Sequence, residues 1–288
     1  MQNTASAPKE HCFLVNGLSI AAKIWNENAR TKAIALHGWL DNANSFDPLA
    51  ALLPDLCIVA LDSVGHGKSD FRSLDATYHI WSEVDECIQV ANQLGWEQFV
   101  LMGHSRGAAI AGLVAGTFPE RISHLVLLEG GIPLPMSSEQ VPENLAQSIE
   151  TTHKLAGTKG TLFPTREAAL TARANGFTKV DMQTAEILAK RSLYEDAEGF
   201  HWHVDARLKA PSPMKLNDAQ IHTFLGKISA PTLLVIGKHG IVEILNHTHA
   251  HFERITDIRK VEMPGGHHLH MEGAEEAIAK EISVLIFS

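Results

Sequence analysis

The sequence predicts an α/β fold in which helices flank a mostly parallel central sheet. Short apolar runs alternate along the chain with longer amphipathic stretches, which is the pattern of successive strand and helix units. The chain has 288 residues, of which 45% are hydrophobic and 20% charged, so it is neither disordered nor of low complexity. At this length we expect one large domain or a domain that carries an insertion.

The apolar runs mark the expected strands. Two of them surround the dipeptide Asn16-Gly17, which indicates an antiparallel hairpin. Later strands are expected within residues 33–38, 57–62, 99–105, 124–130, 232–238 and 259–266. Helices are expected at about residues 44–53, 79–95, 106–118, 243–255 and 273–286. The last helix has acidic residues in its first turn, where the helix dipole favours them.

The alternation stops between Ile132 and about Ile228. This stretch contains helical patterns followed by the sequence GFHWHVDARLKAPSP, and no convincing strand. The helical patterns lie at about residues 143–156, 166–176 and 181–194. A segment of this length between two strands predicts a helical insertion. We therefore expect a core made of residues 1–131 and 229–288, with a helical cap, or lid, made of residues 132–228.

Charge and cysteine content exclude several partners and settings. The chain has 24 Lys and Arg against 33 Asp and Glu, and the net charge of -9 has the wrong sign for a nucleic-acid-binding protein. We find no run of about 18 apolar residues and no signal-peptide core, so neither membrane spanning nor export is expected. The scattered cysteines Cys12, Cys57 and Cys87 favour a reducing, cytoplasmic setting.

The 17 histidines of the chain raise the question of a metal site. The run His247, His249 and His251 is the best candidate. In a helix, however, His249 would point away from the other two, and no nearby carboxylate or cysteine completes a set of ligands. We expect a solvated helix face there, and neither a metal nor a cofactor in the protein.

The segment Gly103-His104-Ser105-Arg106-Gly107 is the strongest chemical signal. It is a G-x-S-x-G motif between an apolar strand and a helix rich in small residues, which is the context of a nucleophile elbow. In such a turn a strained serine holds its hydroxyl above the sheet, and the two glycines let strand and helix approach. Ser105 is therefore the candidate nucleophile. For its neighbours His104 and Arg106, packing roles and contacts with substrate are both open, and His104 is our candidate for a contact with the substrate.

A serine nucleophile needs a general base, and residues 265–272 contain three histidines after the last expected strand. With this serine motif and the histidines that follow, the chain resembles the α/β-hydrolase family. The family's late Gly-His, followed five residues on by Glu, matches Gly266-His267 and Glu272. This resemblance favours His267 over the other two histidines of the segment.

The same resemblance implies an oxyanion hole. In the family it combines the amide that follows the nucleophile, here that of Arg106, with an amide after a strand-end His-Gly, here that of Trp39 after His37-Gly38. The bulky Trp39 side chain is expected to shape the substrate pocket, and His37 to organise the loop. The turn 62–69 matches the family's D-x-x-G-x-G-x-S, and HGWLDNANSF is similar to the serine hydrolase-like subgroup.

The acid departs from the family pattern. The usual aspartate would stand at Gly240, after the strand expected at residues 232–238. Some family members, haloalkane dehalogenases among them, place the carboxylate directly after the strand that follows the nucleophile helix. The matching residue here is Glu129, which keeps the chain order Ser, acid, His. Glu243, three residues beyond the vacant position, is the alternative.

Taken together, the resemblance implies a serine hydrolase that cleaves a small carboxylic ester through an acyl-enzyme. Ser105 would attack, His267 would transfer the proton and Glu129 would hold the imidazole ring. The expected partner is a small-molecule ester. Perhydrolase, amide or peptide, and C–C bond hydrolase activities use the same constellation and stay open. A non-catalytic binding protein on the same fold is a further alternative, supported only by the missing aspartate.

Overall fold

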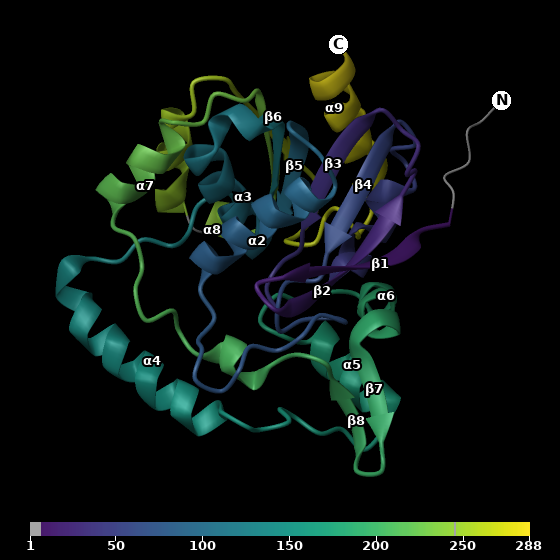
Figure 1. Cartoon of the computed structure of the whole chain (residues 1–288), viewed down its shortest axis with the longest axis vertical. Helices are drawn as coiled ribbons and strands as arrows, with labels where there is room; N and C mark the ends of the chain where they lie inside the picture. The colour runs from purple at the N-terminus through teal and green to yellow at the C-terminus, as the bar shows by residue number, and fades with distance from the viewer. Residues whose placement is uncertain (1–6, 245) are drawn as a thin grey trace.

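One large sheet forms the centre of the protein. The computed structural model describes residues 7–244 and 246–288. The eight strands of the sheet are β1 (Lys9–Val15), β2 (Leu18–Trp25), β3 (Thr31–Leu36), β4 (Leu56–Leu61), β5 (Phe99–His104), β6 (Ile122–Leu128), β9 (Thr232–Gly237) and β10 (Ile258–Met263). Their order in the sheet is β1-β2-β4-β3-β5-β6-β9-β10 (Figure 1). Every strand predicted from the apolar runs is present.

The sheet is antiparallel at one edge and parallel elsewhere. The predicted hairpin joins β1 and β2, and its turn residues Asn16 and Gly17 have φ angles of 52° and 79°, as tight hairpin turns require. Strand β2 is also antiparallel to β4. The pairs from β4 through β3, β5, β6 and β9 to β10 are all parallel, so the carboxyl ends of six strands share one edge of the sheet.

Helices cover both faces of this sheet, as predicted. They are α1 (Asp47–Ala50), α2 (Ile80–Gln93), α3 (Arg106–Thr117), α7 (Asp218–Leu225), α8 (Ile241–Ile244) and α9 (Glu275–Phe287). The single helix expected at 243–255 was wrong, because α8 is short and a 3₁₀ helix at Asn246–Arg254 follows it. Further 3₁₀ turns lie at Ala43–Phe46, Pro119–Arg121, Ser138–Gln140 and Ala206–Lys209. No helix among the described residues is long and apolar enough to cross a membrane.

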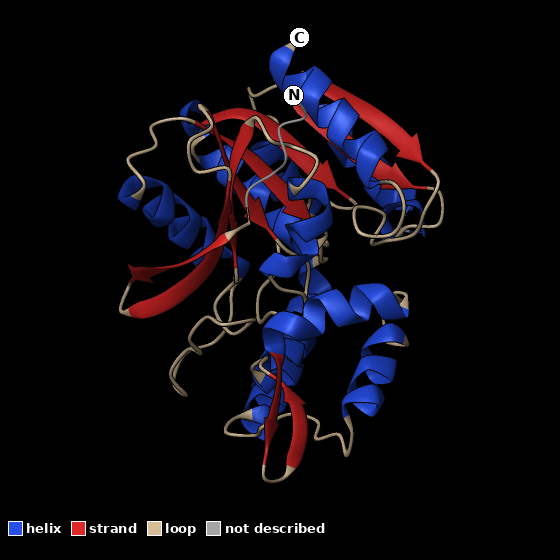
Figure 2. Ribbon diagram, turned by 90° about the vertical axis from the view of Figure 1, so that its right-hand side faces the viewer, coloured by secondary structure: helices blue, strands red, loops and turns tan. Residues whose placement is uncertain are grey.

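The stretch 132–228 contributes no strand to the large sheet within the described residues. It forms the helices α4 (Val141–Leu155), α5 (Arg166–Ala174) and α6 (Met182–Ser192), close to the predicted ranges, and it also contains α7. It further contains a hairpin of β7 (Leu193–Asp196) and β8 (Gly199–Trp202), which the sequence did not predict, because strands of four residues are too short to show a period. Figure 2 shows α4–α6 and this hairpin gathered below the sheet.

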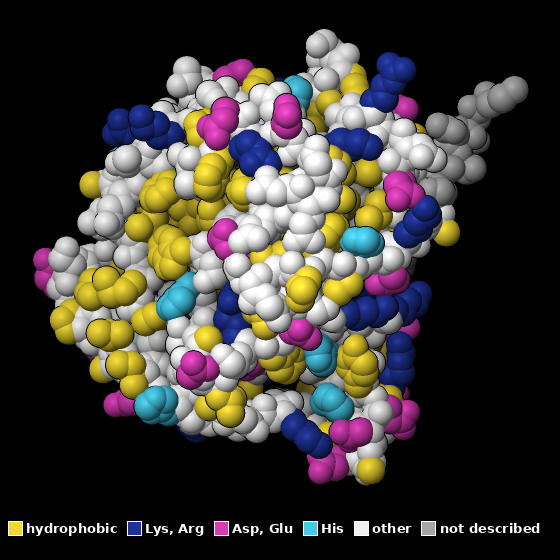
Figure 3. All heavy atoms as spheres, in the orientation of Figure 1, with side chains coloured by type: hydrophobic (Ala, Val, Ile, Leu, Met, Phe, Trp, Pro, Cys, Tyr) yellow, Lys and Arg dark blue, Asp and Glu magenta, His cyan; other side chains and the backbone are white. Residues whose placement is uncertain are grey.

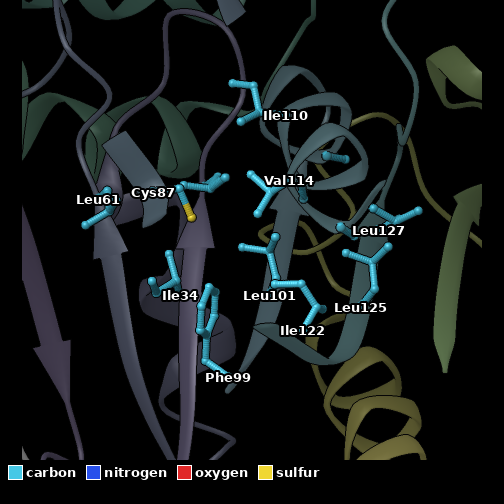
Figure 4. Packing of buried hydrophobic residues seen from close by; sticks show 14 of the residues in the cluster. Ile34, Leu61, Cys87, Phe99, Leu101, Ile110, Val114, Ile122, Leu125 and Leu127 are labelled. Atoms are coloured by element: carbon cyan, nitrogen blue, oxygen red, sulfur yellow. The ribbon is translucent and has the colours of Figure 1, made fainter. Parts of the chain in front are cut away.

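Alternate residues of the central strands pack on opposite faces of the sheet. On β5, Leu101 joins the cluster beneath α2 and α3, while Val100 and Met102 join the cluster beneath α9. Figure 4 shows the first of these clusters, with Leu101 between Ile34 and Leu125. Because both faces are buried, the parallel strands read as unbroken apolar runs, and this is what made them recognisable. The cysteines Cys57 and Cys87 are unpaired core residues.

Truncating Leu101 tests the importance of this packing for stability. The side chain is 0% exposed, so Leu101→Ala is expected to lower the free energy of unfolding by about 2–5 kcal/mol, through lost burial and a cavity. Urea denaturation measures the change. Leu14→Ala is the control, because Leu14 is 71% exposed and its truncation should change stability by no more than about 0.5 kcal/mol. Equal effects of the two substitutions would contradict the packing described above.

Candidate active site

Ser105 occupies a sharp turn between β5 and α3. Its backbone angles, φ 52° and ψ -116°, lie in a region that residues other than glycine rarely adopt. The turn is fixed by the Ser105 amide, which donates to the Leu128 carbonyl at 2.9 Å. A Cβ atom on Gly103 would overlap the backbone of α3, and one on Gly107 would overlap the Leu36 carbonyl. Both glycines of the motif are therefore required by close packing, as the nucleophile-elbow interpretation predicts.

His267 lies in the loop after β10, with its ring beside Ser105. Its Nε2 atom is 2.8 Å from Ser105 Oγ, so the two groups share a hydrogen bond. The His267 side chain is 9% exposed. Burial lowers the pKa of His267 below the ordinary value of 6.5, and Glu129 opposes that shift only in part. The imidazole is therefore neutral at neutral pH, as a general base must be.

Glu129 follows β6 directly, with a φ of 50°, and its carboxylate is fully buried behind His267. Its Oε2 atom is 3.2 Å from His267 Nδ1. The carboxylate also accepts hydrogen bonds from three backbone amides, those of Gly237 and Ile241, each at 2.7 Å, and that of Val242 at 3.5 Å. These donors satisfy a buried negative charge and fix the carboxylate. The side chain of Glu243, the alternative acid, lies outside the described part of the structure.

The space around Gly240 explains why position 240 does not carry the usual acid. A Cβ atom built on this glycine would overlap the carboxylate group of Glu129. The space that a side chain at position 240 would need is therefore already filled by Glu129. Acidic side chains at positions 129 and 240 therefore exclude each other. There is room for one carboxylate beside His267, and in this protein that carboxylate extends from β6.

The amides of Trp39 and Arg106 are available as hydrogen-bond donors. Arg106 is the first residue of α3, so its amide is one of the unpaired donors at a helix start. Trp39 follows β3 in a loop whose next residue, Leu40, has a φ of 61°. Neither amide donates to a protein acceptor within residues 7–244 and 246–288. Both belong to turns that flank Ser105 at the carboxyl edge of the sheet, where the sequence places an oxyanion hole.

Ser105 opens into a cavity of about 380 Å³. Its walls are mainly apolar and combine the sheet edge with the 132–228 stretch, including Trp39, Trp81, Ile132, Leu208, Met214 and Phe252. The Trp39 indole donates to the Leu208 carbonyl at 2.9 Å, which fixes the ring against the residues above it. A second cavity of about 190 Å³ also has Trp39 in its wall. Trp39 thus lines the pocket, as expected from its position.

Figure 3 shows hydrophobic side chains gathered on the outer surface over α4.

The expectation that His104 contacts substrate does not fit its position. His104 is 0% exposed and does not line the cavity, because the residue before the elbow serine points to the opposite side of β5. Its Nε2 atom lies 2.8 Å from the His267 carbonyl oxygen. The Arg106 side chain does reach the cavity wall, where its guanidinium forms an ion pair with Glu83.

The other histidines of the loop do not line the cavity into which Ser105 opens. His268 and His270 are buried and pack around the His104 ring, with centroid distances of 4.9 Å and 4.2 Å. His37, also buried, accepts a hydrogen bond from the Ser63 amide at 3.0 Å and organises the loop, as expected. The side chains of His247 and His249 lie outside the described part of the structure.

Sequence reasoning missed two polar residues near this site. Asp41 and Arg173 form a buried ion pair of 2.6 Å that joins the Trp39 loop to α5. Nothing in the sequence marked either residue, because they lie 132 positions apart and in no catalytic motif. The cavity wall formed by residues 208–215 was also missed, since it belongs to a stretch without a regular pattern.

Comparisons with known proteins identify the family of this chain. A family model described as alpha/beta hydrolase fold matches residues 34–274. A serine hydrolase-like protein of Mus musculus is 30% identical over 274 residues, covering 88% of this chain and 87% of the relative. A similarly named protein of Dictyostelium discoideum is 28% identical over 303 residues, covering 99% and 83%. The crystal structure of a hypothetical protein from Pseudomonas aeruginosa PAO1 superposes with a TM-score of 0.89 at 36% identity, covering 96% of this chain and 97% of that one. The chain therefore belongs to the α/β-hydrolase fold family and, within it, to the serine hydrolase-like proteins.

Proposed function

We propose that the protein is a serine esterase that hydrolyses small carboxylic esters through an acyl-enzyme. The observation that carries this proposal is the continuous chain of contacts from Glu129 through His267 to Ser105, with heavy-atom distances of 3.2 Å and 2.8 Å. A nucleophile bonded to a neutral base, which is oriented by a buried carboxylate, is the arrangement used for acyl transfer.

Acylation begins when Ser105 Oγ attacks the ester carbonyl carbon and His267 Nε2 takes the hydroxyl proton. The carbonyl oxygen becomes an oxyanion, which the Trp39 and Arg106 amides stabilise by donating hydrogen bonds. Each such donor contributes about 2.7–4 kcal/mol in well-studied hydrolases. His267 then gives its proton to the leaving alcohol, and the C–O bond of the ester breaks. Glu129 stabilises the imidazolium while keeping its own charge.

Deacylation repeats these steps with water as the nucleophile. His267 removes a proton from the water, the hydroxide attacks the acyl carbon, and the Ser105 oxygen leaves with the proton that His267 returns to it. The product is a carboxylic acid, and the free Ser105–His267 pair is restored.

We also propose that residues 132–228 act as a cap that selects the substrate. Part of this stretch, around Leu208 and Met214, forms one wall of the cavity opposite the sheet edge. The mainly apolar lining favours an uncharged acyl or alcohol group, and a cavity of about 380 Å³ suits a small ester. Perhydrolase, amide and C–C bond chemistry use the same residues, and substrate panels separate these activities.

Labelling of Ser105 tests the enzyme proposal. A fluorophosphonate probe is expected to label the purified protein, and p-nitrophenyl acetate and butyrate to be hydrolysed. Ser105→Ala should remove labelling and lower kcat by a factor on the order of 10⁴ or more, because the covalent route is lost. Mass spectrometry locates the label. A folded wild-type protein that is neither labelled nor active would instead support a non-catalytic binding protein.

The identity of the acid is tested by two matched substitutions. Glu129→Gln is expected to lower kcat by a factor on the order of 10³–10⁴, since the amide can no longer stabilise the imidazolium. Glu243→Gln should change kcat less than about twofold. Steady-state kinetics with p-nitrophenyl butyrate measures both. If only the second substitution abolishes turnover, the acid is Glu243.

Moving the acidic residue from position 129 to position 240 tests whether the two side chains compete for one space. Gly240→Asp alone is expected to lower activity strongly, because its side chain overlaps the Glu129 carboxylate. In the double variant Glu129→Gly/Gly240→Asp, activity should recover at least about tenfold over either single variant. Double-mutant kinetics provides the measurement. If the activity losses of the two single variants simply add in the double variant, the side chains at positions 129 and 240 do not compete for one space.

The pH dependence follows from the lowered pKa of His267. Only the neutral ring accepts the Ser105 proton, so kcat/KM should rise with pH and level off once His267 is deprotonated. Because burial lowers that pKa below 6.5, the midpoint should lie on the acid side of 6.5. Rates measured between about pH 4.5 and 8 determine it. A midpoint above 6.5 would show that the Glu129 charge outweighs burial.

A further inference from the structure

A buried group of four side chains lies directly behind the proposed catalytic residues. This Asp41 cluster consists of Asp41, His104, His268 and Arg173. The first three are 1%, 0% and 1% exposed, and the Arg173 side chain is 11% exposed. The members come from the Trp39 loop, the end of β5, the His267 loop and α5. Four distant parts of the chain therefore meet at one carboxylate.

Both carboxylate oxygens of Asp41 have partners. Arg173 Nη2 lies 2.6 Å from Oδ1, and His268 Nε2 lies 3.2 Å from Oδ2. The Nδ1 atom of His104 lies 3.5 Å from the same Oδ2 atom, which is ion-pair distance. The space is tight, because a Cβ atom on the neighbouring Gly38 would lie 2.8 Å from both Asp41 Oδ2 and His104 Nδ1. These contacts leave Asp41 little freedom to move.

The charges in the cluster follow from burial and contact. Burial by itself would raise the pKa of Asp41, but His268 and Arg173 overcome that effect and hold it well below the ordinary range. Burial lowers the pKa of His268 to about 4, so this ring is neutral at neutral pH. The Nε2 atom of His268 faces both Asp41 Oδ2 and Arg173 Nη2, so it can donate to the carboxylate or accept from the guanidinium. The strong charge pair is therefore the one between Asp41 and Arg173.

The cluster touches the proposed catalytic residues through their chain neighbours. His268 follows His267, and His104 precedes Ser105. The ring of His104 donates from Nε2 to the His267 carbonyl oxygen at 2.8 Å, which ties the base loop to the end of β5. Asp41 lies two residues after Trp39, whose amide we assign to the oxyanion hole. One carboxylate thus connects the nucleophile strand, the base loop and the oxyanion loop.

We propose that Asp41 is a positioning residue for the hydrolase reaction, and that Arg173 clamps it from the 132–228 stretch. The proposal rests on the proposed function. Asp41 touches no substrate and transfers no proton. It holds the loop of His267 and the loop of Trp39 at a fixed separation, so that base and oxyanion donors are aligned with Ser105 before substrate binds. Preorganisation of this kind acts on kcat, because it lowers the cost of reaching the transition state and leaves binding unchanged.

The same residues do not suit a metal ion. Asp41, His104 and His268 place three possible ligand atoms within 4.8 Å of one another. The Arg173 guanidinium, however, lies 2.6 Å from Asp41 Oδ1 and 3.3 Å from His268 Nε2. A cation already compensates the carboxylate there, and a divalent ion beside it would be repelled. The geometry therefore favours a protein ion pair with its hydrogen-bonded histidines.

The test compares Asp41→Asn with the double variant Asp41→Asn/Arg173→Met. Asp41→Asn leaves Arg173 buried without its charge partner, so lower stability is expected whatever its role. The double variant removes that unpaired charge and should regain most of the melting temperature. If Asp41 positions the catalytic loops, kcat and the rate of fluorophosphonate labelling stay about 10–100-fold below wild type in both variants, with KM changed less than about threefold.

The matched control is Asp205→Asn, which weakens another buried ion pair of the same kind. Asp205 Oδ2 lies 2.6 Å from Arg207 Nη2, and within the described residues neither side chain hydrogen-bonds to the loops of His267 or Trp39. This substitution should lower the melting temperature and leave the labelling rate of the folded protein within about twofold of wild type. Full recovery of kcat in Asp41→Asn/Arg173→Met would overturn the proposal, because the loss in Asp41→Asn would then reflect only an unpaired charge.

Hydrogen exchange supplies a readout that does not need turnover. In the double variant, amides of residues 264–272 should exchange at least about tenfold faster than in wild type, while the central strands remain protected. If the wild-type protein has no esterase activity but the double variant shows this faster exchange, the proposed function is wrong, while the positioning role of Asp41 stands. Unchanged exchange in 264–272 together with wild-type kcat would overturn the positioning role alone.

Discussion

Parallel pairing of β5, β6 and β9 is the constraint on which the site depends. Ser105 follows the first of these strands, Glu129 the second, and Gly240 lies just after the third. Because neighbouring parallel strands end at the same edge, residues far apart in the chain meet there without any long side chain. The Ser105 amide donates to the Leu128 carbonyl, and the Glu129 amide donates to the Val235 carbonyl, each at 2.9 Å. The hydrogen-bond ladder of the sheet thus continues into the turns that hold Ser105 and Glu129.

Buried charge determines how the rest of the site is built. The buried Glu129 carboxylate accepts hydrogen bonds from three backbone amides and lies 3.2 Å from His267 Nδ1, and the carboxylate itself fills the space that a side chain at Gly240 would need. The loop after β9 therefore pairs its amides with an acid from another strand. Where the family pattern has an aspartate this chain has Gly240, and the carboxylate beside His267 comes from the end of β6 instead.

Most of the fold and the sharp turn at Ser105 could be predicted because local sequence determines them, whereas the choice of His267 and Glu129 came from the resemblance to the α/β-hydrolase family. The strands are apolar on both faces, and the Ser105 turn needs glycines at fixed spacing. Residues whose role depends on distant contacts could not be predicted. The Asp41 and Arg173 pair spans 132 positions, and no linear motif records it. The direction of the His104 side chain was predicted wrongly for a related reason. The motif gives the position of His104 in the chain, whereas the pleat of β5 determines the direction in which its side chain points.

The 132–228 stretch is bound to the sheet through polar groups at the Trp39 loop, to which we assign one of the proposed oxyanion donors. Asn42 donates to the Leu188 carbonyl and Ser192 hydroxyl, each at 3.0 Å, and Arg173 pairs with Asp41. These groups are buried, so each bond would leave an unsatisfied partner if the stretch moved away. A rearrangement of α5 and α6 would therefore disturb the Trp39 loop directly. The proposed selection of substrate by the stretch and the proposed alignment of the oxyanion donors would therefore depend on the same few hydrogen bonds.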